Sequence, residues 1–145
     1  MKPLYRKIKA GNEEDIALLS EFIKNAGSTL ENFRYFASRS FNVLNSHLET
    51  GLLIKDNTPL AYGHLDVENG TTWLGIAVIE KEKGKGLGAQ MMNELLNAAV
   101  QHQCKVICLS VDKVNFPAIS LYEKFGFRIE KELSDTIYKM NKNFY

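Results

Sequence analysis

The sequence predicts an α/β fold, a mixed β-sheet with helices on both faces, in the order β-α-α-β-β-β-α-β-α-β-β. Segments with helical apolar spacing alternate with strand-like apolar runs along most of the chain. The dipeptide Asn69-Gly70 is typical of a tight two-residue hairpin, so the runs on either side of it should pair antiparallel. The chain has no internal repeat, low-complexity tract or linker, and residues 1–145 are therefore expected to form a single domain.

Local residue patterns mark where the predicted helices and strands begin and end. Carboxylates at positions 13–15 suit the start of the first helix, and residues 56–58 read as a turn between two strands. Pro117 suits the first turn of a late helix, and Gly126 suits its end. In order, the expected elements are a strand at Leu4–Lys9, a helix after Asn12, a helix at Leu30–Ser38, strands at Leu52–Lys55, Leu60–Glu68 and Thr71–Ile79, a helix after Gly88, a strand at Lys105–Val111, a helix at Asn115–Phe125, and strands at Phe127–Glu132 and Thr136–Met140.

Composition narrows the class of protein. The apolar fraction is 45%, the charged fraction is 24%, and the net charge is +1 with both signs scattered, so no overall field attracts nucleic acid or an anionic membrane. No apolar run approaches the roughly 18 residues that span a bilayer, and the first residues lack the apolar segment of a secretory signal. These features predict a cytoplasmic protein with no nucleic-acid or membrane partner; a homodimer is left open.

The cysteines and histidines predict neither a disulfide nor a metal site. Cys104 and Cys108 are expected at same-parity positions of one strand, where even adjacent residues of a face lie about 6.6 Å apart, which is too far for an unstrained disulfide, so both should be buried, reduced thiols. His47, His64 and His102 lack the spacing of metal ligands, and no metal is expected.

A glycine-rich loop, Lys83–Ala89, follows a strand that should be central. Odd-numbered and even-numbered residues of Trp73–Ile79 are both apolar, which indicates a strand covered on both faces. Glycines that open a helix let the backbone N–H groups approach a phosphate, and the helix start favours an anion. Because Gly86 follows Lys85, the loop is not a Walker motif, and its G-x-G-x-G spacing is not a dinucleotide fingerprint.

Two motifs in the expected order resemble the GNAT superfamily of N-acetyltransferases. That family carries Q/R-x-x-G-x-G/A after its fourth strand, which Lys83–Gly88 matches except for Lys83 in place of Gln or Arg. It also carries N-x-x-A-x-x-x-Y before Gly-Phe, matched by Asn115, Ala118 and Tyr122 with Gly126 following. The resemblance covers the whole chain and implies the same order of strands and helices.

The resemblance also implies roles for individual residues. Main-chain N–H groups of the loop would bind the acyl-CoA pyrophosphate, the main chain near Ala77 and Val78 would hold the pantetheine arm, Asn115 would hydrogen-bond that arm, and Tyr122 would lie near the thioester sulfur. The implied loop residues are Lys83, Gly84, Lys85, Gly86, Leu87, Gly88 and Ala89.

The chemistry of acetyl transfer suggests further roles. A phenol can protonate a departing thiolate, so Tyr122 is the candidate general acid, and a main-chain N–H near Val78 could steady the oxyanion. For the base, His64 and Asp66 share one parity of a strand, and Glu80 is a further option. His64 has an ordinary pKa of about 6.5, which suits a base near neutrality.

The acceptor is expected to be a small primary amine, such as an amino sugar or amino acid derivative. Arg34, Tyr35 and Arg39 lie between the first helices and the central strands, and helical spacing would place Tyr35 beside Arg39. An arginine beside an aromatic ring suits an anionic group on the acceptor. The alternatives are a longer acyl chain, a protein or peptide acceptor, and a non-catalytic acyl-CoA sensor.

Overall fold

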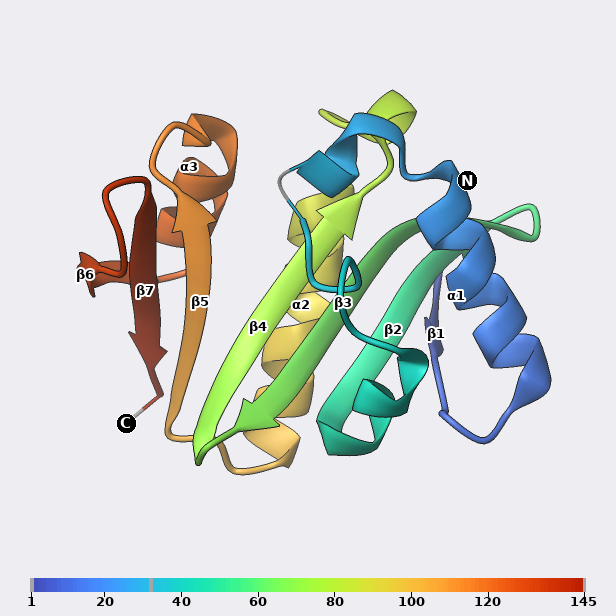
Figure 1. Cartoon of the computed structure of the whole chain (residues 1–145), viewed down its shortest axis with the longest axis horizontal. Helices are drawn as coiled ribbons and strands as arrows, with labels where there is room; N and C mark the ends of the chain where they lie inside the picture. Colours follow the sequence, from blue (N-terminus) through green and yellow to red (C-terminus); the bar gives the residue numbers. More distant parts are fainter. Residues whose placement is uncertain (1, 32, 145) are drawn as a thin grey trace.

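A single seven-stranded sheet forms the centre of the protein, as seen in a computed structural model that describes residues 2–31 and 33–144 (Figure 1). The strand order is β1-β2-β3-β4-β5-β7-β6, which confirms the expected mixed α/β fold. The elements are β1 (Leu4–Lys7), α1 (Glu13–Asn25), the 3-10 helices η1 (Gly27–Glu31) and η2 (Phe41–Ser46), β2 (His47–Lys55), β3 (Thr58–Glu68), β4 (Thr71–Val78), the 3-10 helix η3 (Glu80–Glu82), α2 (Leu87–Gln101), β5 (Val106–Asp112), α3 (Phe116–Lys124), β6 (Arg128–Glu132) and β7 (Ile137–Asn143).

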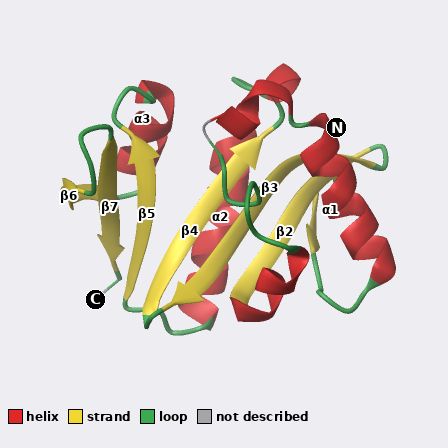
Figure 2. Cartoon of the chain, viewed as in Figure 1, coloured by secondary structure: helices red, strands yellow, loops and turns green. Residues whose placement is uncertain are grey.

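Helices cover both faces of the sheet (Figure 2). Alternate residues of β3 point to opposite faces. On one face, Gly63 lies so close to Met91 of α2 that an added Cβ would meet its sulfur at 2.5 Å. On the other face, the Tyr62 ring stacks on Phe22 of α1 with a centroid distance of 6.0 Å. The buried core is therefore divided between two layers, one under α2 and one under α1.

The hairpin at Asn69-Gly70 is present as predicted. Asn69 has φ +52° and Gly70 has φ +79°, the left-handed pair that a two-residue hairpin turn requires. The register that follows places Glu68 opposite Thr71 and continues without a break to Ala61 opposite Val78. This long antiparallel pairing fixes which edge each residue of β4 presents to its neighbours.

The two central strands β4 and β5 are parallel and separate toward their C-terminal ends. Their register contains one pair, Trp73 with Cys108, near the start of β4. β5 instead pairs along its whole length with β7 on its other side. Beyond Trp73, β4 therefore has one edge that β5 does not cover.

Three expectations need correction. The second helix is not at Leu30–Ser38: η1 occupies that place in the order, residues 33–40 are irregular with a turn at 35–36 and a bend at 37–38, and Asn32 lies outside the described residues. The strand at Trp73–Ile79 is central, but several of its residues are only half-buried because the sheet opens beside it. Cys108 is buried as expected, whereas Cys104 is half-buried, and both are free thiols.

Among residues 2–31 and 33–144, none of the helices combines the length and apolar character that crossing a bilayer requires. The same ranges contain no three His, Cys, Asp or Glu side chains placed to share a metal ion.

Candidate active site

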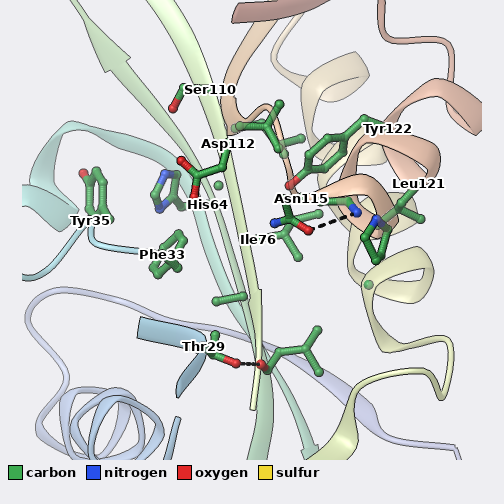
Figure 3. Close-up of a pocket in the computed structure, with 18 of the residues that line it drawn as sticks. Thr29, Phe33, Tyr35, His64, Ile76, Ser110, Asp112, Asn115, Leu121 and Tyr122 are labelled. Atoms are coloured by element: carbon green, nitrogen blue, oxygen red, sulfur yellow. Dashed lines mark hydrogen bonds between the residues drawn. The ribbon is translucent and has the colours of Figure 1, made fainter. Parts of the chain in front are cut away.

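A cavity of about 910 Å³ opens where β4 and β5 separate (Figure 3). The start of α2, the start of α3 and the segment after η1 complete its walls. Nearly all of the predicted site residues line it: Arg34, Tyr35, Arg39, His64, Asp66, Ala77, Val78, Lys83, Gly84, Gly86, Leu87, Gly88, Ala89, Asn115 and Tyr122. Lys85 and the third candidate base, Glu80, are not among the lining residues.

One edge of β4 supplies main-chain hydrogen-bonding groups to this cavity. The N–H of Ile79 donates to the carbonyl of Leu60 in β3, so by strand alternation Ala77 also turns its main chain toward β3. Ile76 and Val78 then turn their N–H and C=O groups to the opposite, uncovered edge. The predicted contribution of Val78 fits this geometry. The main-chain N–H and C=O groups of Ala77 instead pair with β3, so Ile76 rather than Ala77 offers such groups at the uncovered edge.

Thr29 closes one end of this edge. Its hydroxyl donates to the carbonyl of Val78 at 2.6 Å, and the Thr29 side chain is buried (Figure 3). The carbonyl of Val78 is thereby satisfied, whereas its N–H has no acceptor among the described residues. A donor without a partner at the cavity wall is available to a ligand.

The glycine loop presents a row of unpaired amides. No main-chain N–H from Gly84 to Ala89 finds an acceptor in the described ranges; the next one, that of Gln90, donates to the carbonyl of Gly86 at 3.1 Å. Gly84 and Gly86 have φ values of +82° and +84°, which favour glycine, and the space where their Cβ atoms would lie is open. α2 begins directly after Gly86 and adds the positive end of its dipole. Unpaired amides at the start of a helix favour the approach of an anion.

The lysines of the loop are paired with neighbouring carboxylates. Lys83 lies 3.1 Å from Glu80, and Lys85 lies 3.3 Å from Glu82. Both pairs are largely exposed, so their contribution to stability is small. The Glu80 carboxylate has a pKa below its ordinary value because it accepts hydrogen bonds from Ser28 and Lys83. A carboxylate with a lowered pKa is a weaker base.

Asn115 and Tyr122 are held by α3 on the β5 side of the cavity. Asn115 is the N-cap of α3, and its side-chain oxygen accepts from the N–H of Ala118 at 3.4 Å, which leaves its amide nitrogen as a donor. Tyr122 is buried, and burial raises the pKa of its phenol to about 12. Its hydroxyl has no partner in the described part of the chain, and Figure 3 shows the ring directed toward Asn115 and β4.

His64 is buried on the face of β3 that packs under α1, and it lines the cavity together with Tyr35 and Arg39. The Tyr62 hydroxyl lies 2.6 Å from its Nδ1. Burial lowers the pKa of His64 well below its usual range, and the nearby His47 and Arg39 act in the same direction. Its ring lies over Gly75, where an added Cβ would meet Nε2 at 2.6 Å. Glycine at position 75 is therefore what makes room for the imidazole.

Asp66 is the centre of a buried hydrogen-bond network rather than a free carboxylate. One oxygen accepts from the Tyr35 hydroxyl at 2.6 Å, and the other accepts from the Ser46 hydroxyl at 2.7 Å. The same Tyr35 hydroxyl lies 2.8 Å from His47 Nε2. The pKa of Tyr35 is raised by burial and by its bond to Asp66. This network ties the segment after η1 to β2 and β3.

The predicted neighbourhood of Tyr35 and Arg39 is present, although no helix creates it. The guanidinium carbon of Arg39 lies 4.5 Å from the Tyr35 ring centroid, and its Nη1 donates to the Tyr35 carbonyl at 3.0 Å. Arg34 lies 3.9 Å from Asp112 at the end of β5. The tight turns after Phe33 bring these side chains together through ring packing against β3, as in the 5.5 Å approach of Phe33 to Tyr62.

The cavity-lining residues that were not anticipated include Thr29, Ile76, Ser110 and Asp112. Strand parity counted back from the Asn69-Gly70 turn could have identified Ile76 as an edge residue. No local signal marks the other three, because they reach the cavity only when distant elements pack together.

A profile of the acetyltransferase (GNAT) family matches residues 16–127. The chain belongs to this family, which confirms the resemblance seen in its motifs.

Individual proteins match this chain either over part of its length or at low sequence identity. A probable spermine N(1)-acetyltransferase of Bacillus subtilis subsp. natto (strain BEST195) is 43% identical over 70 residues, which are 47% of this chain and 46% of that protein. The chain thus spans about half the length of the curated relatives it matches. Among solved structures, the PaiA N-acetyltransferase of Thermoplasma acidophilum, in complex with coenzyme A, has a TM-score of 0.77 at 18% identity and covers 99% of this chain and 100% of that one. A GNAT family acetyltransferase of Elizabethkingia anophelis with acetyl-CoA bound has a TM-score of 0.73 at 18% identity, with 99% of both chains covered. At these identities the two structures establish the fold.

Proposed function

We propose that this protein transfers an acetyl group from acetyl-CoA to the primary amine of a small acceptor. The observation that carries the proposal is one cavity in which unpaired amides of residues 84–89, an uncovered edge of β4 and the Tyr122 hydroxyl all meet. A diphosphate suits the amides, and an extended amide-containing arm suits the strand edge. Family membership and the coenzyme bound to two structural neighbours support acetyl-CoA as the donor.

The pantetheine arm lies along β4 in this proposal. The edge N–H and C=O groups of Ile76, together with the Val78 N–H, pair with it as an added strand would, and the amide nitrogen of Asn115 donates to it from the opposite wall. The thioester carbonyl then lies beside the edge, where the Val78 N–H stabilises the oxyanion.

The proton balance of the reaction needs no strong base if the free amine attacks. The amine adds to the thioester carbonyl, the carbon–sulfur bond breaks, and the proton lost by nitrogen ends on the thiol through Tyr122. A phenol with a pKa of about 12 holds its proton at neutral pH until the thiolate departs, and Tyr122 then gives that proton to the sulfur and takes up the one lost by nitrogen.

In this proposal the neutral His64 ring serves as a hydrogen-bond donor through its Nε2–H group. Burial raises the pKa of Tyr62 well above its ordinary value, so its hydroxyl keeps its proton, and His64 Nδ1 is the acceptor available to it. The resting tautomer of His64 therefore carries its proton on Nε2. Asp66, with both oxygens engaged, positions Tyr35 and the segment after η1.

Replacing His64 by Gln separates the donor role from the base role. Gln keeps an N–H group but cannot take a proton near neutrality. If His64 is a donor, His64→Gln should lose no more than about 10-fold in kcat/KM and keep the wild-type pH profile. That profile should rise toward alkaline pH with deprotonation of the acceptor amine, because His64 is already neutral well below pH 6.5. A loss of about 10³-fold with a changed acid limb would instead assign His64 as the base.

The acceptor class is tested by release of free CoA across a panel of amines. We propose an acceptor with an anionic group, as in an amino acid or amino sugar derivative, because Arg34 and Arg39 line the acceptor end. A polyamine is the second candidate, since a relative that is 43% identical over about half the chain is described as a probable spermine N(1)-acetyltransferase. Binding of acetyl-CoA with no CoA release from any amine would indicate a sensor, and release only with lysine-containing peptides would indicate a protein acceptor.

A further inference from the structure

An ion pair crosses the acceptor half of the cavity. Asp112 is the last residue of β5, and Arg34 belongs to the segment after η1 on the other side of the uncovered β4 edge. The distance from Asp112 Oδ1 to Arg34 Nη2 is 3.9 Å, which is long for an ion pair. The Asp112 side chain is 19% exposed and that of Arg34 is 60% exposed. The pair joins the two walls of the cleft without a close hydrogen bond between these atoms.

Asp112 differs from the other carboxylates that line the cavity. Asp66 is occupied by two hydroxyl groups, and Glu82 is paired with Lys85 at 3.3 Å. Glu68 is exposed at the hairpin end of β3, where water solvates it. Asp112 is the carboxylate that is both largely shielded from solvent and held only at long distance. In the view of Figure 3 it lies between His64 and Tyr122.

A primary ammonium can make a better contact with Asp112 than Arg34 does here. Charge-assisted N–H···O bonds to a carboxylate are about 2.7–2.9 Å long, and Arg34, being mostly exposed, is readily solvated when it is displaced. Displacement also leaves the guanidinium beside the docked acceptor. An acceptor with an anion near its amine would then contact both members of the pair.

Building on the proposed function, we propose that Asp112 docks the ammonium of the acceptor by displacing Arg34, and that Arg34 then binds an anionic group of the same molecule. The docked ammonium releases one proton to solvent before the free amine attacks the thioester. The pair thus favours acceptors that carry both an ammonium and an anionic group, and it disfavours simple amines and polyamines. Asp112 is a substrate-binding residue in this account, whereas coenzyme binding rests on the glycine loop and the β4 edge.

Three probes test this selection in the full-length protein: glucosamine 6-phosphate, glucosamine and spermine. We expect wild-type kcat/KM for glucosamine 6-phosphate to exceed that for glucosamine by at least about 10-fold, with spermine the poorest. Asp112→Asn should raise the KM for either sugar by at least about 10-fold and leave the KM for acetyl-CoA within about 2-fold. Arg34→Gln should raise the KM for glucosamine 6-phosphate alone.

Asp135→Asn is the matched control, since it makes the same change at an exposed carboxylate that does not line the cavity and should leave every KM unchanged. Thermal unfolding of each variant verifies that the fold is retained. An unchanged acceptor KM in Asp112→Asn, or a wild-type preference for spermine that Arg34→Gln increases, would overturn the docking role while leaving the acetyltransferase proposal in place. Absence of CoA release with all three probes would overturn the acceptor class proposed for the pair, and absence with the whole amine panel would also remove the proposed function.

Discussion

The two ends of the cavity are built in different ways. The end proposed for the coenzyme consists of main-chain groups from one part of the sequence, residues 76–78, 82–84 and 86–89, and two of its glycines face open space. The end proposed for the acceptor consists of side chains from segments far apart in the sequence, as in the bond between Tyr35 and Asp66, which are 31 residues apart. The first end depends on backbone conformation, and the second depends on packing. Substitutions at the two ends should therefore have different effects on binding, turnover and stability.

The largest effect is expected at the boundary between the ends, at Tyr122. Tyr122→Phe removes the donor to the thiolate and should lower kcat by about 10²-fold with acetyl-CoA affinity unchanged. Tyr138→Phe is the matched control, because Tyr138 is a partly buried tyrosine of β7 that is not among the cavity-lining residues. Stopped-flow measurement of CoA release checks both variants. Full turnover of Tyr122→Phe with chemistry rate-limiting would remove Tyr122 from the mechanism.

At the coenzyme end, Gly86 and Gly70 form a natural pair for comparison. Both have positive φ near +80° and open space at the Cβ position, so alanine imposes a similar backbone strain of about 1–2 kcal/mol at each. Only Gly86 lies in the proposed diphosphate site. Gly86→Ala should weaken acetyl-CoA binding by about 10-fold, whereas Gly70→Ala should lower stability alone. Calorimetry and thermal unfolding distinguish the two, and equal affinities would argue against the loop as the anion site.

At the acceptor end, Tyr35→Phe should affect both stability and acceptor binding. It removes the phenol bonded to Asp66 and His47, which should cost about 1–2 kcal/mol in the free energy of unfolding and raise the acceptor KM a few-fold. Tyr5→Phe is the control, because the Tyr5 hydroxyl donates to Glu49 at 2.7 Å and neither residue lines the cavity. Urea unfolding should give similar losses for both variants. An acceptor KM raised equally in both would mean that Tyr35 acts through stability alone.

The smallest effect is expected for Lys85. This side chain pairs with Glu82 and is not a cavity-lining residue, although the loop motif includes it. Lys85→Ala should change the Kd for acetyl-CoA by less than about 3-fold, because an exposed charge is screened by solvent and salt. A change above 10-fold in calorimetry would show that the lysine contacts the coenzyme directly.

Local signals in the sequence were enough to predict the hairpin and the glycine loop at the start of α2. The Asn69-Gly70 turn sets the β3–β4 register, and the two positive-φ glycines place free amides at the start of α2. The predicted helix over Leu30–Ser38 was wrong because aromatic side chains at helical spacing, such as Phe36, pack instead against Tyr62 at 5.5 Å. Propensity is a weak guide where tertiary contacts of this kind are available. The start of β2 was missed for a similar reason: Glu49 and Thr50 are polar yet buried.

By itself, the sequence determined the family, the order of the elements and the position of the glycine loop. Each of these depends on backbone preferences of a few adjacent residues, above all glycine and the Asn-Gly turn. Tertiary structure alone decided that two hydroxyl groups occupy Asp66, that the Tyr62 hydroxyl meets Nδ1 of His64, and that Arg34 meets Asp112 across the cleft. Those features come from side chains that become neighbours only when β4 and β5 separate and the segment after η1 packs over the opening, so no local pattern encodes them.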